Sequence, residues 1–334
     1  MKSFGIEFVP MDLYWRTAYY SIQAEKLGYD NVWITDHFNN RNVYVSLSVV
    51  ANYTERIKLG PGVTNPYIVH PVITAQSVAS LNEIAPGRIV CGIGAGDRTT
   101  LEQVGVGMKS PLRAVREAVG VIRRQIAREK GAYEGRMFQM SEGARFNFKV
   151  QNRIPIYVGA QGPKMLRLAG SIGDGALINA SHPDDIREAV KHVKGGVERA
   201  GRQMADIEIA AYTSFSVAQK EKSARKPVVP VAAYIVAGSP PSILEKHGIS
   251  LKVADQIRND LANRRWGEAF GAVDSNMIEA FSICGTPDQC IGKIEALFKT
   301  GITQFVTGSP LGPKVRASID LFGREVLPHF KESS

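Results

Sequence analysis

Apolar residues are concentrated in eight short runs that are rich in β-branched and aromatic side chains. Most of the intervening segments repeat apolar residues every three or four positions, which is typical of amphipathic helices. The runs are 3–9, 30–35, 56–60, 88–93, 154–159, 174–178, 206–215 and 302–307, and the clearest helical segments are 13–28, 69–83, 110–129, 163–171 and 184–200. This alternation predicts parallel strands joined by helical crossovers.

Eight such units within 334 residues favour a closed (β/α)₈ barrel, with a doubly wound open sheet as the alternative. No linker rich in Pro or Ser interrupts the chain, so we expect one domain over residues 1–334. Two insertions break the repeat. Residues 131–153, after the fourth strand, read as a loop or β excursion, and residues 220–285, after the seventh, as a long, largely helical segment. Because loops after barrel strands build active sites, the second insertion is a candidate substrate cover.

The net charge of +9 is unevenly distributed along the chain. Residues 109–153 hold eleven Lys or Arg residues against four Glu residues. This excess is interpreted either as a solvated helix face or as a positive field that attracts an acidic ligand. The chain contains no nucleic-acid recognition module, so we expect no nucleic-acid partner.

The cellular setting is inferred from apolar runs and cysteines. No run approaches the length of a membrane span, and Glu7 interrupts the place where a signal peptide would need its apolar region. Cys91, Cys284 and Cys290 form no metal-ligand pattern and no disulfide framework. We therefore expect a cytoplasmic protein without a membrane segment or a bound metal.

The segment Gly60–Pro66 follows a strand-like run and contains two glycines and two prolines. Gly reaches backbone angles that other residues avoid, whereas Pro fixes its own φ and lacks a donor. Such a corner is interpreted either as an ordinary turn or as an unusual backbone path against which a flat cofactor rests. Similar polar or Gly-rich segments follow other predicted strands, and this recurrence favours the cofactor interpretation.

Three of these segments offer binding groups. Asp36 and His37 follow the second strand, where a neutral His could donate a hydrogen bond to a cofactor carbonyl; the other interpretation is a polar strand end. Gly159–Gly162 opens a helix near Pro163, and amides at a helix N-terminus bind phosphate. Gly94–Asp97 lets a ligand approach the backbone, with Asp97 as a polar contact.

Glu7 lies among Ile6, Phe8 and Val9 on the first strand. An acid placed there is partly buried, and burial disfavours the charged carboxylate. Glu7 is therefore a candidate proton donor near neutral pH, and the alternative is a salt-bridged or exposed strand residue.

Several long strings closely resemble the methylenetetrahydromethanopterin reductases, the deazaflavin-dependent enzymes of archaeal one-carbon metabolism. The resemblance spans nearly the whole chain. It is carried by the strings 4–10, 33–40, 60–66, 173–181, 301–306 and 308–310. It implies a luciferase-like (β/α)₈ barrel with a non-prolyl cis peptide at Gly62–Val63, forming a bulge that supports the deazaflavin ring.

The resemblance also implies the ligands and their contacts. The cofactor would be coenzyme F420, with Asp36 and His37 at the polar edge of its ring and the Gly159–Gly162 loop at its phosphate. The full set of implied cofactor contacts is Asp36, His37, Gly62, Val63, Thr64, Gly94, Ala95, Gly96, Gly159, Ala160, Gln161, Gly162 and Asn179.

The implied reaction is the reversible reduction of methylene-tetrahydromethanopterin to the methyl form by direct hydride transfer in a ternary complex. Glu7 would protonate a pterin nitrogen and open the ring to an iminium ion, with Asp97 as a supporting contact. The alternatives are another F420-dependent oxidoreductase acting on an alcohol or sugar phosphate, an FMN monooxygenase, or a non-catalytic flavin-binding protein. The resemblance further implies a homodimer or homotetramer. Apolar residues in 41–53 and 70–85 could form its interface or could equally be core.

Overall fold

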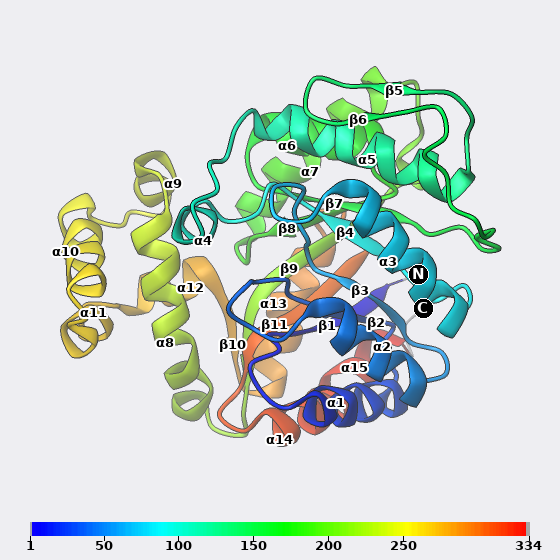
Figure 1. Ribbon diagram of the computed structural model, residues 1–334. Helices are drawn as coiled ribbons and strands as arrows, with labels where there is room; N and C mark the ends of the chain where they lie inside the picture. Colours follow the sequence, from blue (N-terminus) through cyan, green and yellow to red (C-terminus); the bar gives the residue numbers. More distant parts are fainter. Residues whose placement is uncertain (1, 332–334) are drawn as a thin grey trace. The chain divides into compact units, whose positions relative to one another are not determined.

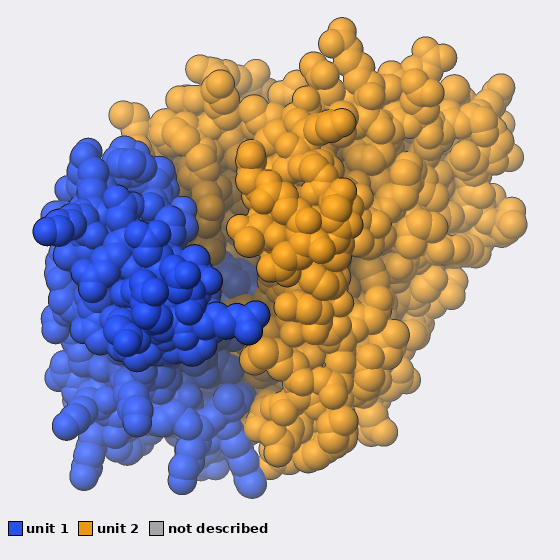
Figure 2. Space-filling view, turned by 60° about the vertical axis from the view of Figure 1, so that its left-hand side comes forward, with its two compact units in different colours: residues 1–2, 180–187, 211–334 blue, residues 3–179, 188–210 orange. Residues whose placement is uncertain are grey.

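The computed structural model describes residues 2–331 and shows an α/β fold (Figure 1). Its contacts divide the chain into two compact units (Figure 2). One, orange and labelled unit 2 in Figure 2, contains residues 3–179 and 188–210. The other, blue and labelled unit 1 there, contains residues 2, 180–187 and 211–331. We call them the first unit and the second unit and describe each by itself. The expectation of a single domain over 1–334 stays a prediction.

The first unit contains six parallel strands in the order of the chain. Hydrogen bonding gives the orders β3-β2-β1 and β8-β7-β4, and isolated parallel bridges at Leu59–Ile89 and Thr64–Ile93 connect β3 with the β4 region. A doubly wound sheet would reverse its strand order, so the sequential order contradicts that alternative. The strands are β1 (Ser3–Phe8), β2 (Asn31–Ile34), β3 (Lys58–Pro61), β4 (Cys91–Ile93), β7 (Ile156–Ala160) and β8 (Gly175–Asn179).

Helices follow these strands, and several of the helices begin with a proline. Pro71, Pro111 and Pro163 are the first residues of their helices. A backbone N–H at this position has no acceptor within the helix, so proline, which lacks an N–H, loses no hydrogen bond there. The first helix ends at Gly28, whose φ of 93° suits a residue without a Cβ. The helices are α1 (Tyr14–Leu27), α2 (Val43–Tyr53), α3 (Pro71–Ile84), α4 (Arg98–Gln103), α5 (Pro111–Ala127), α6 (Pro163–Ile172) and α7 (Pro183–Arg199, whose first five residues belong to the second unit).

The sheet of the first unit curves around its inner face. Trp33 on β2 and Tyr157 on β7 lie edge to face with ring centroids 5.1 Å apart. Between these strands lie β3 and β4, so a flat sheet would separate them by about 14 Å. The ring contact therefore places both side chains on the concave face.

The second unit contains the remaining strands and the long insertion. Its strands are β9 (Glu208–Val217, whose first three residues belong to the first unit), β10 (Ser282–Gly285) and β11 (Gln304–Leu311). β9 pairs with β11 and, in parallel, with β10. The helices are α8 (Glu221–Gly238), α9 (Pro241–Lys246), α10 (Leu251–Ala262), α11 (Trp266–Gly271), α12 (Ser275–Phe281), α13 (Pro287–Phe298), α14 (Val315–Leu321) and α15 (Leu327–Lys331).

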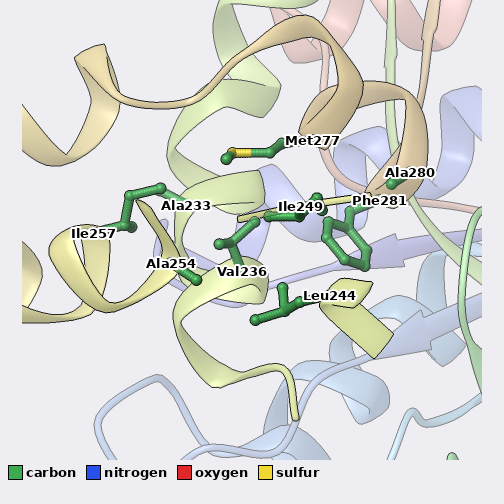
Figure 3. Close-up of a cluster of buried hydrophobic side chains, with 9 residues drawn as sticks. All are labelled: Ala233, Val236, Leu244, Ile249, Ala254, Ile257, Met277, Ala280 and Phe281. Atoms are coloured by element: carbon green, nitrogen blue, oxygen red, sulfur yellow. The ribbon is translucent and has the colours of Figure 1, made fainter. Parts of the chain in front are cut away.

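The helical insertion has its own hydrophobic cluster (Figure 3). Side chains from α8, α9, α10 and α12 pack together there, so burial within the insertion holds its short helices. The buried members are Ala233, Val236, Leu244, Ile249, Ala254, Ile257, Met277, Ala280 and Phe281. The insertion ends one element earlier than predicted, because residues 282–285 form β10 against β9.

The predicted strand runs and the predicted excursion at 131–153 agree with the observed elements. Each of the eight predicted runs contains or overlaps a strand, and the 131–153 excursion forms a hairpin of β5 (Tyr133–Glu134) and β6 (Gln139–Met140). The short helix α4 was not predicted. Within residues 2–331, no helix is both long and apolar enough to cross a bilayer.

Most of the apolar residues proposed for a subunit interface belong to the core instead. Of the apolar residues that suggested an interface in 41–53 and 70–85, Val43, Leu47, Val50 and Leu81 are buried and Ile73 is exposed. The helical period explains this outcome, since apolar residues spaced three or four apart on α2 and α3 face their own sheet.

Candidate active site

The Gly62–Val63 peptide bond is cis, which confirms the prediction for this corner. Backbone hydrogen bonds fix it on both sides. Gly62 N–H donates to the carbonyl of Ile34 at 2.8 Å, and Thr64 N–H donates to that of Gly92 at 3.0 Å. The Thr64 carbonyl in turn accepts from Gly94 N–H at 2.9 Å. The corner is therefore a bulge held between β2 and β4.

The Val63 side chain fills the space left by two glycines on neighbouring strands. A Cβ on Gly94 would lie 2.9 Å from Val63 Cγ2, and one on Gly159 would lie 3.1 Å from Val63 Cγ1. Any larger residue at either position would push against the bulge. These glycines therefore have a packing role that the sequence interpretation missed; direct approach of a ligand to Gly94 stays a prediction.

Asp36 lies directly beside the bulge. Its Oδ2 accepts a hydrogen bond of 2.7 Å from the hydroxyl of Thr64, which is itself fully buried. Burial raises the pKa of the Asp36 carboxyl, against the opposing effects of the Thr64 hydrogen bond and the neighbouring His37. Both Asp36 and His37 are partly exposed, so their polar atoms can meet a ligand. The structure thus places Thr64 against Asp36, the chain neighbour of His37, and the contact of Asp36 and His37 with the ring edge stays a prediction.

Glu7 lies on the concave face of the first unit. It pairs in register with Trp33, and residues paired in a parallel ladder point to the same side of the sheet. Because Trp33 points inward, Glu7 does too. Its side chain is buried, with 7% of the residue exposed. The expectation of a buried acid on the first strand is confirmed.

Asp97 has a structural role that was not predicted. Its Oδ1 accepts hydrogen bonds of 2.7 Å from both the backbone N–H and the hydroxyl of Thr100, so it caps α4. Asp97 is exposed, as is Gly96 before it, whereas Ala95 is partly exposed. Gly96 has a φ of 77°, which favours glycine there. The expected support of Glu7 by Asp97 stays a prediction.

The Gly159–Gly162 segment consists of the last two residues of β7 and the two residues that lead into α6. Gly162 is the N-cap of this ten-residue helix, and Pro163 follows it, as the sequence indicated. A Cβ on Gly162 would meet nothing within 4 Å, so its surroundings are open. Asn179 is the last residue of β8 and is exposed. These positions suit the phosphate contact and the strand-end contact expected of them, and both roles stay predictions.

The arginines of the basic region hold the backbone around α5. Arg123 and Arg153 both bond the carboxylate of Asp174, Arg123 at 3.2 Å. Arg124 donates to the carbonyl of Gly131, and Arg128 donates to that of Phe146. Arg123, Arg153 and Asp174 also line a cleft of about 490 Å³. Four arginines of the region therefore have structural partners, and the attraction of an acidic ligand by the remaining charge stays a prediction.

Among residues 2–331, no group of three or more His, Cys, Asp or Glu side chains is placed to hold a metal ion. The three cysteines are buried and unbonded to one another. Burial raises the pKa of the Cys91 and Cys290 thiols to about 12. The polar groups around the bulge instead suit a flat heterocycle: a carboxylate, an imidazole and a glycine loop at a helix N-terminus, beside a fixed backbone surface.

Comparison with known proteins agrees with this geometry. The model of the luciferase-like monooxygenase family matches residues 16–304. The chain is 47% identical to a 5,10-methylenetetrahydromethanopterin reductase of Archaeoglobus fulgidus, over 98% of this chain and 99% of that protein. It is 46% identical to the enzyme of the same name from Methanolobus tindarius, over 97% and 99% of the two chains.

A solved structure gives the same result. The coenzyme F420-dependent tetrahydromethanopterin reductase of Methanopyrus kandleri matches with a TM-score of 0.94 and 42% identity, over 98% of this chain and 99% of that one. The match supports an eight-stranded, parallel, nearly closed barrel of the luciferase-like type. An F420-dependent secondary alcohol dehydrogenase, 24% identical with a TM-score of 0.82 and coverage of 98% of both chains, shares the fold.

Proposed function

The chain belongs to the luciferase-like monooxygenase family and, within it, to the 5,10-methylenetetrahydromethanopterin reductases, and we propose that it catalyses their reaction with coenzyme F420. The observation that carries the proposal is the 47% identity over 98% of the chain. The product would be methyl-tetrahydromethanopterin, and the reaction would be reversible.

Four groups of the first unit would hold the cofactor. The fixed Gly62–Val63 bulge offers a surface for one face of the deazaflavin ring, and Asp36 and His37 offer hydrogen-bonding groups for its polar edge. The Gly159–Gly162 loop and the N-terminus of α6 offer amides for the phosphate. Reduced F420, when bound, supplies the hydride.

Glu7 would supply the proton. A methylene bridge between two nitrogens is a poor hydride acceptor, so one C–N bond must first open. The Glu7 carboxyl protonates one pterin nitrogen, that nitrogen leaves the bridging carbon, and the resulting iminium accepts the hydride. The buried position of Glu7 keeps bulk water from competing for this proton.

The testing experiment is anaerobic mixing of the protein with reduced F420 and methylene-tetrahydromethanopterin. We expect the absorbance of oxidised F420 to rise with one methyl product formed per cofactor oxidised. Glucose 6-phosphate and a secondary alcohol, tested with oxidised F420, probe the alternative dehydrogenase function. Oxygen consumption with reduced FMN probes the monooxygenase function. Turnover only with one of these other substrates would overturn the proposal.

We also propose that the protein forms a homodimer or homotetramer. Exposed apolar side chains remain on α2 and α3 after folding, including Val45, Tyr53, Ile73 and Ile84. Such surfaces favour association when they are contiguous. Light scattering after size exclusion would measure the mass, and a monomer at micromolar concentration would contradict the proposal.

A further inference from the structure

Thr35 continues β2 toward the bulge and lies between two groups of the site. Its N–H donates to the carbonyl of Phe8 at 3.1 Å, so its backbone extends the pairing with β1. On the other side, Ile34 pairs with Pro61, and its carbonyl accepts from Gly62 N–H. Thr35 therefore lies one residue before Asp36 and next to the cis peptide bond.

The Thr35 side chain shares a face of the sheet with Glu7. Successive strand residues alternate sides, so Thr35 and Trp33 point the same way. Trp33 points to the concave face, as its contact with Tyr157 shows, and Glu7 pairs with it in register. The hydroxyl of Thr35 is thus on the inner face, at the end of β2 where the bulge begins.

This hydroxyl is buried without a partner. Thr35 is 8% exposed, and within residues 2–331 its Oγ1 has no hydrogen-bond partner. By contrast, the buried hydroxyls of Thr64 and Thr213 donate at 2.7 and 3.0 Å. A buried polar group left unsatisfied costs about 1–3 kcal/mol, so its retention calls for an explanation.

Within residues 2–331, the hydroxyls of Tyr44, Thr74 and Ser216 also lack a hydrogen-bond partner, and Tyr44 on α2 lies near Asp36 as well. Thr74 lies on helix α3, and Ser216 lies on β9 in the second unit. Thr35 differs because Asp36 follows it, Gly62 flanks it and Glu7 shares its face. A hydroxyl both donates and accepts, so it can pair with a ring carbonyl or a ring N–H.

We propose that Thr35 is a cofactor-binding residue whose hydroxyl hydrogen-bonds a heteroatom of the deazaflavin ring. The inference rests on the proposed function for the identity of the cofactor. It adds a contact on the inner side of the ring to the edge contacts of Asp36 and His37. The hydroxyl is thus unsatisfied in the apoprotein and satisfied in the complex.

The test is the affinity for oxidised F420, measured by quenching of its fluorescence, in wild type, Thr35→Val and Thr35→Ser. Valine keeps the branched shape and removes the hydroxyl, whereas serine keeps the hydroxyl. We expect the Kd to rise about five- to tenfold in Thr35→Val and to stay within about twofold in Thr35→Ser. Ser216→Ala, which removes a buried unpartnered hydroxyl elsewhere, is expected to leave the Kd unchanged.

Thermal unfolding of the apoprotein gives an independent measurement. Because Thr35→Val replaces an unsatisfied buried hydroxyl by a methyl group, its Tm is expected to equal or exceed that of wild type. An unchanged Kd in Thr35→Val would overturn the inference, as would an equal loss of affinity in Thr35→Ser. Wild type that binds F420 but does not reduce methylene-tetrahydromethanopterin would overturn the proposed function alone. Wild type that binds no F420 would overturn both.

Discussion

Thr64, the residue that follows the cis peptide bond, donates its hydroxyl to the carboxylate of Asp36 at 2.7 Å. This bond joins the bulge after β3 to the polar end of β2. Backbone N–H groups of the bulge also donate hydrogen bonds to the carbonyls of Ile34 and Gly92. The same network of hydrogen bonds therefore holds both the bulge and the Asp36 carboxylate in place. A ligand resting on the bulge would therefore meet a carboxylate at a fixed place.

Asp36→Asn is expected to stabilise the apoprotein at pH 7. Burial raises the pKa of Asp36 above its ordinary value of 3.8, so the folded state binds more protons than the unfolded state between these two pKa values. The Asp36 contribution to stability therefore falls as the pH rises through this window. Asparagine carries no charge and keeps an oxygen for Thr64.

Urea unfolding at pH 7 and at pH 4 measures this difference. The gain in the free energy of unfolding is expected at pH 7 and should shrink toward pH 4. Asp36→Asn should also weaken F420 binding, by about tenfold, because a charged hydrogen-bonding group is lost. A variant less stable than wild type at pH 7 would contradict the burial argument.

Gly94→Ala is expected to destabilise the protein by about 1–3 kcal/mol, because its Cβ would lie 2.9 Å from Val63 Cγ2. Val63→Ala removes that methyl, so the double variant should lose less stability than the sum of the two single variants. Urea unfolding of all four proteins gives the coupling energy. Gly107→Ala, with open space around its Cβ, is the control. Additive losses would show that Val63 and Gly94 are not in steric contact.

Asp97→Ala is expected to lower the free energy of unfolding by about 1 kcal/mol, because α4 loses its N-cap. Asp97→Asn should keep this stability, since Asn caps helices about as well as Asp. Asp97→Ala removes both the N-cap and the charge, whereas Asp97→Asn removes only the charge. If Asp97 supports Glu7 or the pterin, Asp97→Asn should reduce turnover while its unfolding curve matches wild type. Full turnover in Asp97→Asn would limit Asp97 to its capping role.

Asp174→Ala is expected to cost about 2 kcal/mol of stability. Its carboxylate, 12% exposed, accepts from Arg123, Arg153 and the backbone N–H of Ile156, and all three would lose a partner. Arg153→Ala should cost less than about 1 kcal/mol, because its side chain is 76% exposed. Equal losses in the two variants, measured by urea unfolding, would contradict the central position of Asp174.

The strands and most helices were predictable because their signals are local. An apolar run with β-branched residues identifies a strand, and Pro163 after a glycine loop identifies the start of α6. Glu7 was recognisable as a buried acid because apolar residues flank it. The cis bond at Gly62–Val63 was predicted only through the family resemblance.

Contacts between distant residues were not predictable from one sequence. The fit of Val63 between Gly94 and Gly159 depends on three strands meeting, and the capping role of Asp97 depends on the short helix α4. The role of Val43 and Leu47 as core was left open because the same helical period serves a core and an interface. The only sequence signal for Thr35 was its spacing of two residues from Trp33, which puts both side chains on the same side of the strand. This signal indicates a site residue only once the structure shows that Trp33 lies on the concave face.

The most direct test of the central claim compares wild type with Glu7→Gln in anaerobic oxidation of reduced F420 by methylene-tetrahydromethanopterin. The Kd for F420 is measured for both proteins, so that a loss of turnover is not confused with a loss of cofactor. We expect turnover in wild type and a loss of at least about a hundredfold in Glu7→Gln, with the Kd unchanged. Turnover in Glu7→Gln within a few-fold of wild type would remove Glu7 as the proton donor, and wild type that binds F420 without turnover would contradict the reductase assignment.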